Sequence, residues 1–138
     1  MDLKQEYKNI TNKEGFLCSI SIINNKLQFH FLNNNKIITY ENSQKISEDE
    51  PYSKPGTIIE ELNLDLIKST PEQTLKLAQE ELKKLNESSI NHFIILNQNK
   101  IPTWNITFIT NSYKTFNIKI NAITNQILNQ SLDQLIRS

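Results

Sequence analysis

The strongest constraint on the fold is a helix predicted over residues 70–86, because the signals for its start and for its apolar face agree. Thr70 can accept a hydrogen bond from a first-turn amide, Pro71 suits the first helical position, and Gln73 can reach back to complete a capping box. Apolar residues then recur at three- and four-residue steps and form one stripe, made of Leu75, Ala78, Leu82 and Leu85. Such a stripe requires an apolar surface to cover, so we expect a sheet beneath it.

Three strand-like runs follow this helix, over residues 90–98, 103–110 and 114–122. Alternation places Trp104, Ile106 and Phe108 on one face of the second run, and the third run has a similar apolar face. Turns are expected at residues 99–100 and 111–112. Pro102 has no amide hydrogen to donate, so it belongs at the start of a strand or at a sheet edge. We predict that Trp104 or its strand neighbours are buried under the helix.

The N-terminal part of the chain predicts a similar set of elements. Residues 2–12 have helical spacing, and Gly15 is a plausible stop. Strands are predicted over residues 16–23, 27–32 and 37–41. They are separated by asparagine pairs or triplets, which favour tight hairpin turns because asparagine tolerates positive φ.

Between these two sets of elements, residues 42–56 are polar, charged or structure-breaking, and they predict a loop. We therefore expect a single compact domain over residues 1–138, with halves 1–41 and 57–138 joined by the polar loop 42–56. Residues 57–67 predict a short helical turn followed by extended chain, and residues 131–136 predict a last helical turn.

The predicted fold class is α+β: an antiparallel sheet of two three-stranded meanders, covered by one or two helices. Because each half reads as one helix and three strands, the order of elements suggests an αβββ-αβββ pseudo-repeat. The two meanders would join edge to edge or pack as two sheets around one core.

The stretch over residues 69–128 resembles the PepSY family of small modules. The resemblance rests on the helix opening at Thr70-Pro71-Glu72-Gln73, on the strand that carries Trp104, and on the closing sequence Ile118-Lys-Ile-Asn-Ala-Ile-Thr-Asn-Gln-Ile-Leu128. Relatives usually have Asp and Gly where this chain has Asn121 and Asn125. Asn125 can adopt the left-handed conformation of glycine, whereas a role that needs the Asp charge would be lost.

The resemblance implies a non-catalytic module that restrains or chaperones a peptidase, or that serves as an envelope sensor. PepSY relatives often lie outside the cytoplasm. The first residues of this chain lack the basic-then-apolar pattern of a secretory signal, which favours the cytoplasm for the chain as written, but a leader can be removed. The compartment therefore stays open.

Composition excludes several classes of function. Lys+Arg number 15 and Asp+Glu also number 15, so the net charge of zero provides no long-range attraction to nucleic acid. Only Gly15 and Gly56 are glycines, which argues against phosphate-binding glycine loops. The chain has no run of about 20 apolar residues, the length that a helix needs to span a bilayer. The preference for lysine, asparagine and isoleucine indicates an AT-rich genome and carries no mechanism.

Three isolated residues are candidates for chemistry. Cys18 is the only cysteine, and alternation places it on the face of Phe16 and Ile20, where it would act as a small apolar group. His30 is expected on the face opposite its apolar neighbours, and His92 near the start of a strand. Neither histidine has a metal-ligand or nucleophile partner at a characteristic spacing.

Carboxylates and aromatic residues also favour structural roles. The acidic run 48–50 is expected in a solvated loop, because adjacent carboxylates point in different directions and do not form a cation site. The remaining carboxylates are expected on a solvated, lysine-rich surface; they are Glu60, Glu61, Asp65, Glu80, Glu81 and Glu87. The aromatic residues that could stack on bases are expected in the core instead; they are Trp104, Phe108, Tyr113 and Phe116.

We therefore predict a binding or regulatory module and assign no catalytic, cofactor-binding or metal-binding residue. It would engage a protein partner, such as a peptidase, through an exposed strand edge or the loop 42–56. The alternative is a structural subunit, either a homo-oligomer or part of an envelope assembly, paired through the same edges. An enzyme is the third reading, and it would need His30 or His92 to meet a carboxylate in a pocket.

Overall fold

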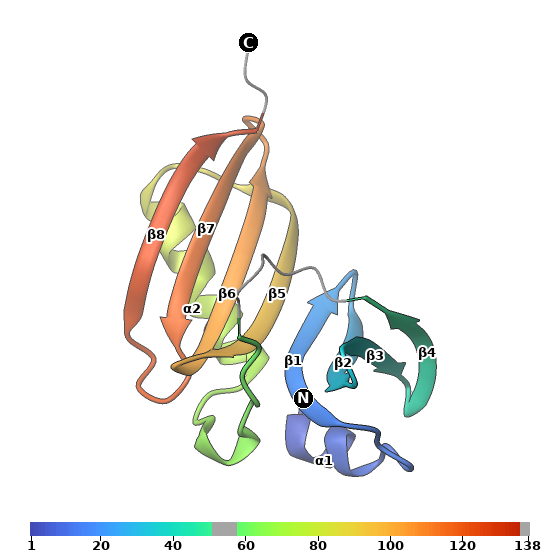
Figure 1. Ribbon diagram of the computed structural model, residues 1–138. Helices are drawn as coiled ribbons and strands as arrows, with labels where there is room; N and C mark the ends of the chain where they lie inside the picture. The colour runs from blue at the N-terminus through green and yellow to red at the C-terminus, as the bar shows by residue number, and fades with distance from the viewer. Residues whose placement is uncertain (51–57, 136–138) are drawn as a thin grey trace.

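The computed structural model describes residues 1–50 and 58–135 (Figure 1). Within them lie one eight-stranded antiparallel sheet and two α-helices, which confirms the α+β fold class. In chain order the elements are α1 (Leu3–Lys8), β1 (Phe16–Ile23), β2 (Lys26–Asn33), β3 (Lys36–Glu41), β4 (Gln44–Asp49), the 3₁₀ segment η1 (Leu64–Leu66), α2 (Pro71–Lys84), β5 (Ser89–Asn99), β6 (Ile101–Thr110), β7 (Lys114–Asn121) and β8 (Ile127–Gln134).

The strands follow the order β4-β3-β2-β1-β5-β6-β7-β8 across the sheet. Strands β1–β4 form one meander and β5–β8 form the other, and the two join through antiparallel pairing of β1 with β5, where Ile20 lies opposite Leu96. Each meander therefore has four strands, one more than the three predicted from the sequence. Strands β4 and β8 lie at the two edges of the sheet (Figure 1).

The prediction of a loop over residues 42–56 was wrong for β4, which pairs with β3 along residues 44–49. Asn42 and Ser43 have φ values of 50° and 66°, the left-handed pair that a two-residue hairpin turn requires. The sequence predicts a loop here because β4 is almost entirely polar and contributes little to the core. Residues 51–56 of the predicted loop lie outside the described residues.

The prediction of a helical turn over residues 131–136 was also wrong. Residues up to Gln134 continue β8, which pairs with β7 from Ile127 onward, and Ile136 lies outside the described residues. The spacing of Leu132 and Leu135 suggested a helix, but Leu132 lies opposite Phe116 in the sheet and packs against the core. Backbone pairing with β7 thus decides the conformation of a segment whose side chains are mostly exposed.

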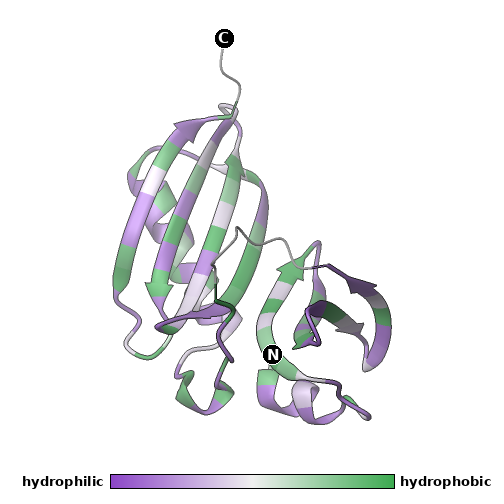
Figure 2. Ribbon diagram, in the orientation of Figure 1, coloured by the Kyte–Doolittle hydropathy of each residue, from purple (hydrophilic) through white to green (hydrophobic). Residues whose placement is uncertain are grey.

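Both helices cover the same face of the sheet and share one core with it. Tyr7 of α1 stacks on Phe31 of β2, with ring centroids 6.0 Å apart, and α2 lies behind β6 and β7 in Figure 1. Apolar and polar residues alternate along the central strands (Figure 2), so the strands bury one face. The helix predicted over residues 2–12 is shorter than expected and spans only Leu3–Lys8.

Helix α2 has the predicted capping box: Thr70 Oγ1 accepts from the Gln73 amide at 3.1 Å, and Gln73 Oε1 accepts from the Thr70 amide at 2.9 Å. Ala78 and Leu82 are buried as predicted, and Leu75 is half-buried. The prediction for Leu85 was wrong, since its side chain is 44% exposed. The helix ends at Lys84, so Leu85 lies past the last turn.

Trp104 is buried beneath α2, as predicted, with a relative exposure of 1%. Its indole Nε1 donates a hydrogen bond to Ser69 Oγ at 3.0 Å, and Ser69 is also buried. Ser69 precedes the Thr70 cap, so this bond fixes the start of α2 over the sheet. Ile106 and Phe108 continue the buried face of β6.

The asparagine turns behave as predicted. Asn24 and Asn25 have φ values of 52° and 62°, and Asn34 and Asn35 have φ values of 50° and 63°. These left-handed pairs connect β1 to β2 and β2 to β3. Asn125, at φ 65°, takes the conformation that glycine would adopt in the last turn.

Residues 58–67 differ from the prediction of a helical turn followed by extended chain. Residues 58–63 have no regular secondary structure and the helical turn η1 comes after them, so the turn lies later than predicted; residue 57 lies outside the described residues. Leu62 accounts for this order, because its amide donates to the Leu17 carbonyl at 2.8 Å and its side chain is buried, which ties the segment before η1 to β1.

Candidate functional site

His30 lies on the sheet face opposite the core and bridges three strands. Its Nε2 is 2.8 Å from Ser21 Oγ on β1, and its Nδ1 is 2.9 Å from Thr39 Oγ1 on β3. Both partners are hydroxyl groups, so the imidazole is held in place but has no carboxylate to orient or charge it. Burial lowers the pKa of His30, which favours the neutral ring.

This burial makes stability depend on pH through His30. In the unfolded chain the imidazole binds a proton near its ordinary pKa of 6.5, whereas the folded protein binds it only at lower pH. The unfolded state therefore gains protons first as the pH falls below about 6.5, and the folded state loses stability until the pH passes its own lowered pKa. We expect urea denaturation to show that the free energy of unfolding falls more steeply between about pH 7.5 and pH 5 for wild type than for His30→Gln. Parallel curves for the two proteins would contradict this assignment.

His92 lies on β5 and is half-buried. Its ring centroid is 6.0 Å from that of Phe108, and its backbone amide donates a hydrogen bond to Asn91 Oδ1 at 2.8 Å. Within residues 1–50 and 58–135, neither His92 nor His30 forms a hydrogen bond or ion pair with a carboxylate. The histidine–carboxylate pair that an enzyme reading requires is thus not assembled by the described residues.

Cys18 does not share a face with Ile20, contrary to the alternation argument. A β-bulge between Leu17 and Ser19 places Cys18 as an extra residue opposite His30, so the alternation shifts by one and Leu17 takes the core position. The thiol donates a hydrogen bond to the His30 carbonyl at 3.2 Å. Burial raises the pKa of Cys18, which keeps the thiol protonated and weakly nucleophilic.

The carboxylates are dispersed over separate contacts. Glu60 accepts from the Lys100 amide at 2.9 Å, and Asp65 pairs with Lys4 at 3.1 Å. A hydrogen bond from the Ser112 hydroxyl lowers the pKa of Glu87. Within the described residues, no group of three His, Cys, Asp or Glu side chains is placed to hold a metal ion.

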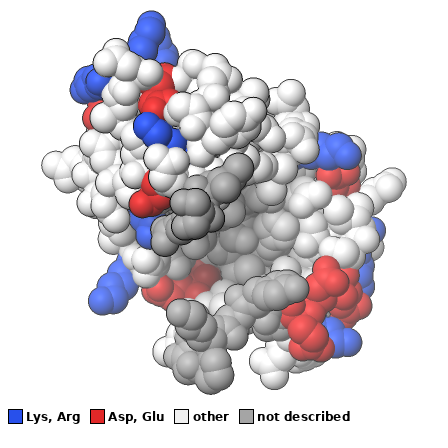
Figure 3. Space-filling model, turned by 90° about the horizontal axis from the view of Figure 1, so that it is seen from above, with Lys and Arg blue, Asp and Glu red and all other residues white. Residues whose placement is uncertain are grey.

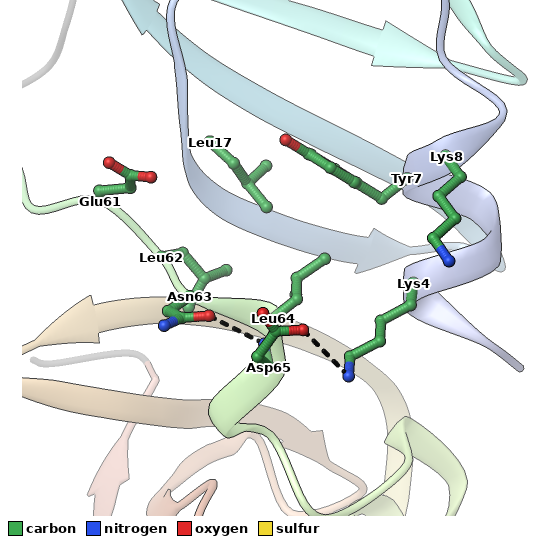
Figure 4. A pocket seen from close by; sticks show the side chains of 9 residues that line it. All are labelled: Lys4, Tyr7, Lys8, Leu17, Glu61, Leu62, Asn63, Leu64 and Asp65. Atoms are coloured by element: carbon green, nitrogen blue, oxygen red, sulfur yellow. Dashed lines mark hydrogen bonds and ion pairs between the residues drawn. The ribbon is translucent and has the colours of Figure 1, made fainter.

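A cavity of about 640 Å³ lies between α1 and the segment that leads into η1 (Figure 4). Its chemistry is mixed: Lys4 and Lys8 from α1 face a segment that carries Glu61 and Asp65, and Tyr7 forms an aromatic wall. The Lys4–Asp65 ion pair joins the two sides of this lining, α1 and η1. These groups provide solvated charges of both signs but no nucleophile paired with a base, so the cavity supports no catalytic assignment.

A second hollow, of about 750 Å³, lies on the opposite face where the two meanders meet. Cys18 and His30 form part of its floor, and Ile95 contributes an aliphatic surface that is 37% exposed. Among the described residues, Gln98 Oε1 is buried here without a hydrogen-bond partner. His30 and Glu60 both line this hollow, but within the described residues no hydrogen bond or ion pair joins them, so they do not form the pair that an acid–base mechanism needs.

Among the described residues, the aromatic side chains of the central strands are not available to stack on bases. Trp104, Phe108 and Phe116 are at most 1% exposed, as predicted. The prediction of Tyr113 in the core was wrong, because its side chain is 61% exposed at a turn. Among the described residues drawn in Figure 3, lysines and carboxylates lie close to one another. No described helix is long and apolar enough to cross a membrane.

The two edges of the sheet differ in charge. Strand β4 carries Lys45, Glu48 and Asp49 along six residues, and Lys45 pairs with Glu14 and Glu48. Strand β8 has eight residues with Asp133 as its one charge. Charged side chains on an edge strand discourage other strands from pairing with it, so β4 is protected and β8 is not.

The pairing register shows which backbone groups of β8 are free. The Leu135 amide donates to the Tyr113 carbonyl at 3.0 Å, and the ladder alternates from this pair onward. The amides and carbonyls of Asp133, Ser131 and Asn129 therefore point toward β7. The intervening residues point away from it; they are Gln130, Leu132 and Gln134. Among the strands described, none pairs with this outer side.

Comparisons with known proteins support the fold but give no information on function. No family model matches the sequence, and no curated protein matches it. A crystal structure of a putative lipoprotein from Clostridium difficile 630 is similar, with a TM-score of 0.61 and 15% identity over 94% of this chain and 87% of that chain. At this identity the likeness concerns the arrangement of strands and helices.

Sequence reasoning predicted an exposed edge in general but did not find the strand that provides it. The signal was the stretch Leu128-Asn-Gln-Ser-Leu132, which alternates apolar and polar residues too weakly to indicate a strand. Because an edge strand is held mainly by backbone bonds, its side chains carry little information about its conformation.

Proposed function

We propose that this protein is a non-catalytic, PepSY-like binding module that engages an extended segment of a protein partner through the outer edge of β8. The observation that carries the proposal is this eight-residue edge with a single charge, whose outer side pairs with no other described strand. An added strand would form main-chain hydrogen bonds with Gln130, Leu132 and Gln134, as in β-strand addition. Binding of this kind needs no catalytic group, cofactor or metal.

The rest of the fold supports this role by keeping β8 in position. Strand β8 pairs with β7 along its length, and Leu132 anchors its inner face against the core. Helix α2 packs on β6 and β7, and β7 is the strand that pairs with β8. The PepSY resemblance of residues 69–128 includes the start of β8, and it favours a peptidase as the class of partner.

We further infer that the two halves are a structural repeat, each made of one helix and four strands. Supporting this are the same order of elements in α1–β4 and α2–β8, and the meeting of the halves through their first strands, β1 and β5. In such a repeat, β4 and β8 would be equivalent edges of which only one carries several charges. Superposition of residues 3–49 on 71–134 tests the idea, and failure of the strands to align would reject it.

Proline substitutions test which side of β8 is used. Gln130→Pro removes an amide hydrogen that points away from β7, so we expect it to retain the fold and to abolish binding at the edge. Ser131→Pro removes a hydrogen bond to β7, so we expect it to lower the free energy of unfolding by at least about 1 kcal/mol. Urea denaturation of both variants checks the assignment, and equal destabilisation would contradict it.

The proposed function is then tested by capture from extracts of the source cells with wild type, Gln130→Pro and the β4 variant Ile46→Pro. We expect a protein that binds wild type and Ile46→Pro but not Gln130→Pro. Its direct binding should be reproduced with purified components, and hydrogen exchange should show protection of β8 in the complex. A captured protein that binds all three proteins equally, or protection elsewhere with β8 unchanged, would reject the proposal.

A further inference from the structure

The outer edge of β8 is complementary to itself when two copies meet in antiparallel orientation. Only residues whose amides and carbonyls point away from β7 can form the new ladder, and these are Gln130, Leu132 and Gln134 in each copy. The register must therefore pair members of this set with one another. Several registers satisfy this condition, so the side chains decide between them.

One register gives the best side-chain contacts. When Leu132 lies opposite Leu132 of the second copy, the half-buried leucines meet on the helix-covered side of the sheet, where each already packs on its own core. Gln130 then lies opposite Gln134. On the other face, Ser131 lies opposite Asp133 of the second copy, so the single charge of each edge does not face its like.

Neighbouring registers are less favourable. Moving the axis to Asp133 sets the two carboxylates opposite each other, which is destabilising. Moving it to Ser131 sets each Leu132 opposite Gln130 and removes the apolar pair. We propose that β8 pairs with β8 of a second copy about a two-fold axis at Leu132, joining two eight-stranded sheets into one. This inference rests on the proposed function of the β8 edge and names a second copy of this chain as its occupant.

The test uses two substitutions at one exposed position. Ser131→Lys would face Asp133 of the second copy twice in the dimer, and Ser131→Glu would set carboxylates opposite each other at the same places. We expect sedimentation equilibrium of the full chain to show a reversible species of twice 16.1 kDa. We expect the dissociation constant to fall by about 2- to 30-fold for Ser131→Lys and to rise by a similar factor for Ser131→Glu.

The control variants make each outcome decisive. Gln130→Pro should be monomeric, and circular dichroism should show that all three variants keep the wild-type fold. If both Ser131 variants raised the dissociation constant of the dimer, Ser131 would lie opposite Ser131 of the second copy, and the proposed register would be wrong. A wild-type protein that stays monomeric up to about millimolar concentration would overturn the inference. The proposed function would survive that result, because capture of a different protein that fails with Gln130→Pro tests the edge independently.

Discussion

Trp104→Ala is expected to lower the free energy of unfolding by about 3–5 kcal/mol, the range for removing a large buried aromatic side chain. Trp104 is 1% exposed and lies where α2, β6 and the chain entering α2 meet. Its removal leaves a cavity that a paired sheet cannot close, and it leaves the buried Ser69 hydroxyl without its donor. Because Trp104 is the only tryptophan, unfolding should be followed by circular dichroism instead of fluorescence.

Two milder variants separate the components of this effect. Trp104→Phe keeps most of the apolar volume but loses the indole donor, and Ser69→Ala removes only the acceptor. We expect Ser69→Ala to cost about 1 kcal/mol and Trp104→Phe to fall between it and Trp104→Ala. A loss below about 1 kcal/mol for Trp104→Ala would show that the residue is not part of the core that the fold assigns to it.

Leu82→Ala is expected to cost about 2–5 kcal/mol, because Leu82 is 3% exposed and packs α2 on the sheet. The residue that caps this helix supplies a matched control. Leu85 has the same side chain three positions later but is 44% exposed past the end of the helix. We expect Leu85→Ala to change stability by less than about 0.5 kcal/mol, since substitutions away from buried contacts usually do.

Thermal and urea denaturation of the two variants measure the orientation of α2 directly. The periodicity of the sequence predicts that Leu82 and Leu85 belong to one buried stripe, whereas in the fold Leu82 is buried and Leu85 is exposed. Comparable losses for Leu82→Ala and Leu85→Ala would support the periodicity and contradict the fold. A neutral Leu82→Ala would reject the orientation of α2 altogether.

Sequence reasoning was most successful where local signals and burial agree. The capping box at Thr70 and Gln73 located the start of α2, and alternation located β6 around Trp104. The asparagine pairs located the first two hairpins because left-handed turns need residues that tolerate positive φ. In the helix cap, the buried strand and the hairpin turns, the observed conformation is the one that each residue type favours.

Prediction from the sequence failed where backbone hydrogen bonds, and not side-chain burial, determine the conformation. Strands β4 and β8 are edge strands with few buried side chains, so the periodicity that identifies a strand is weak in both. Cys18 was placed on the wrong face because a bulge shifts the alternation by one residue, and nothing local to Cys18 indicates a bulge. The candidate site lies on one of these strands, which is why sequence reasoning named an edge without locating it.

The junction between the meanders also sets how the chain can fold. Every pairing within a meander joins strands that are consecutive in sequence, so each hairpin closes a short loop. The pairing of β1 with β5 is different, because the chain between Ile20 and Leu96 includes three strands and α2. Closing so long a loop costs more conformational entropy and is slower than forming a hairpin. The last and slowest event in folding should therefore be the docking of two meanders, and until it occurs the edges of β1 and β5 are as open as that of β8.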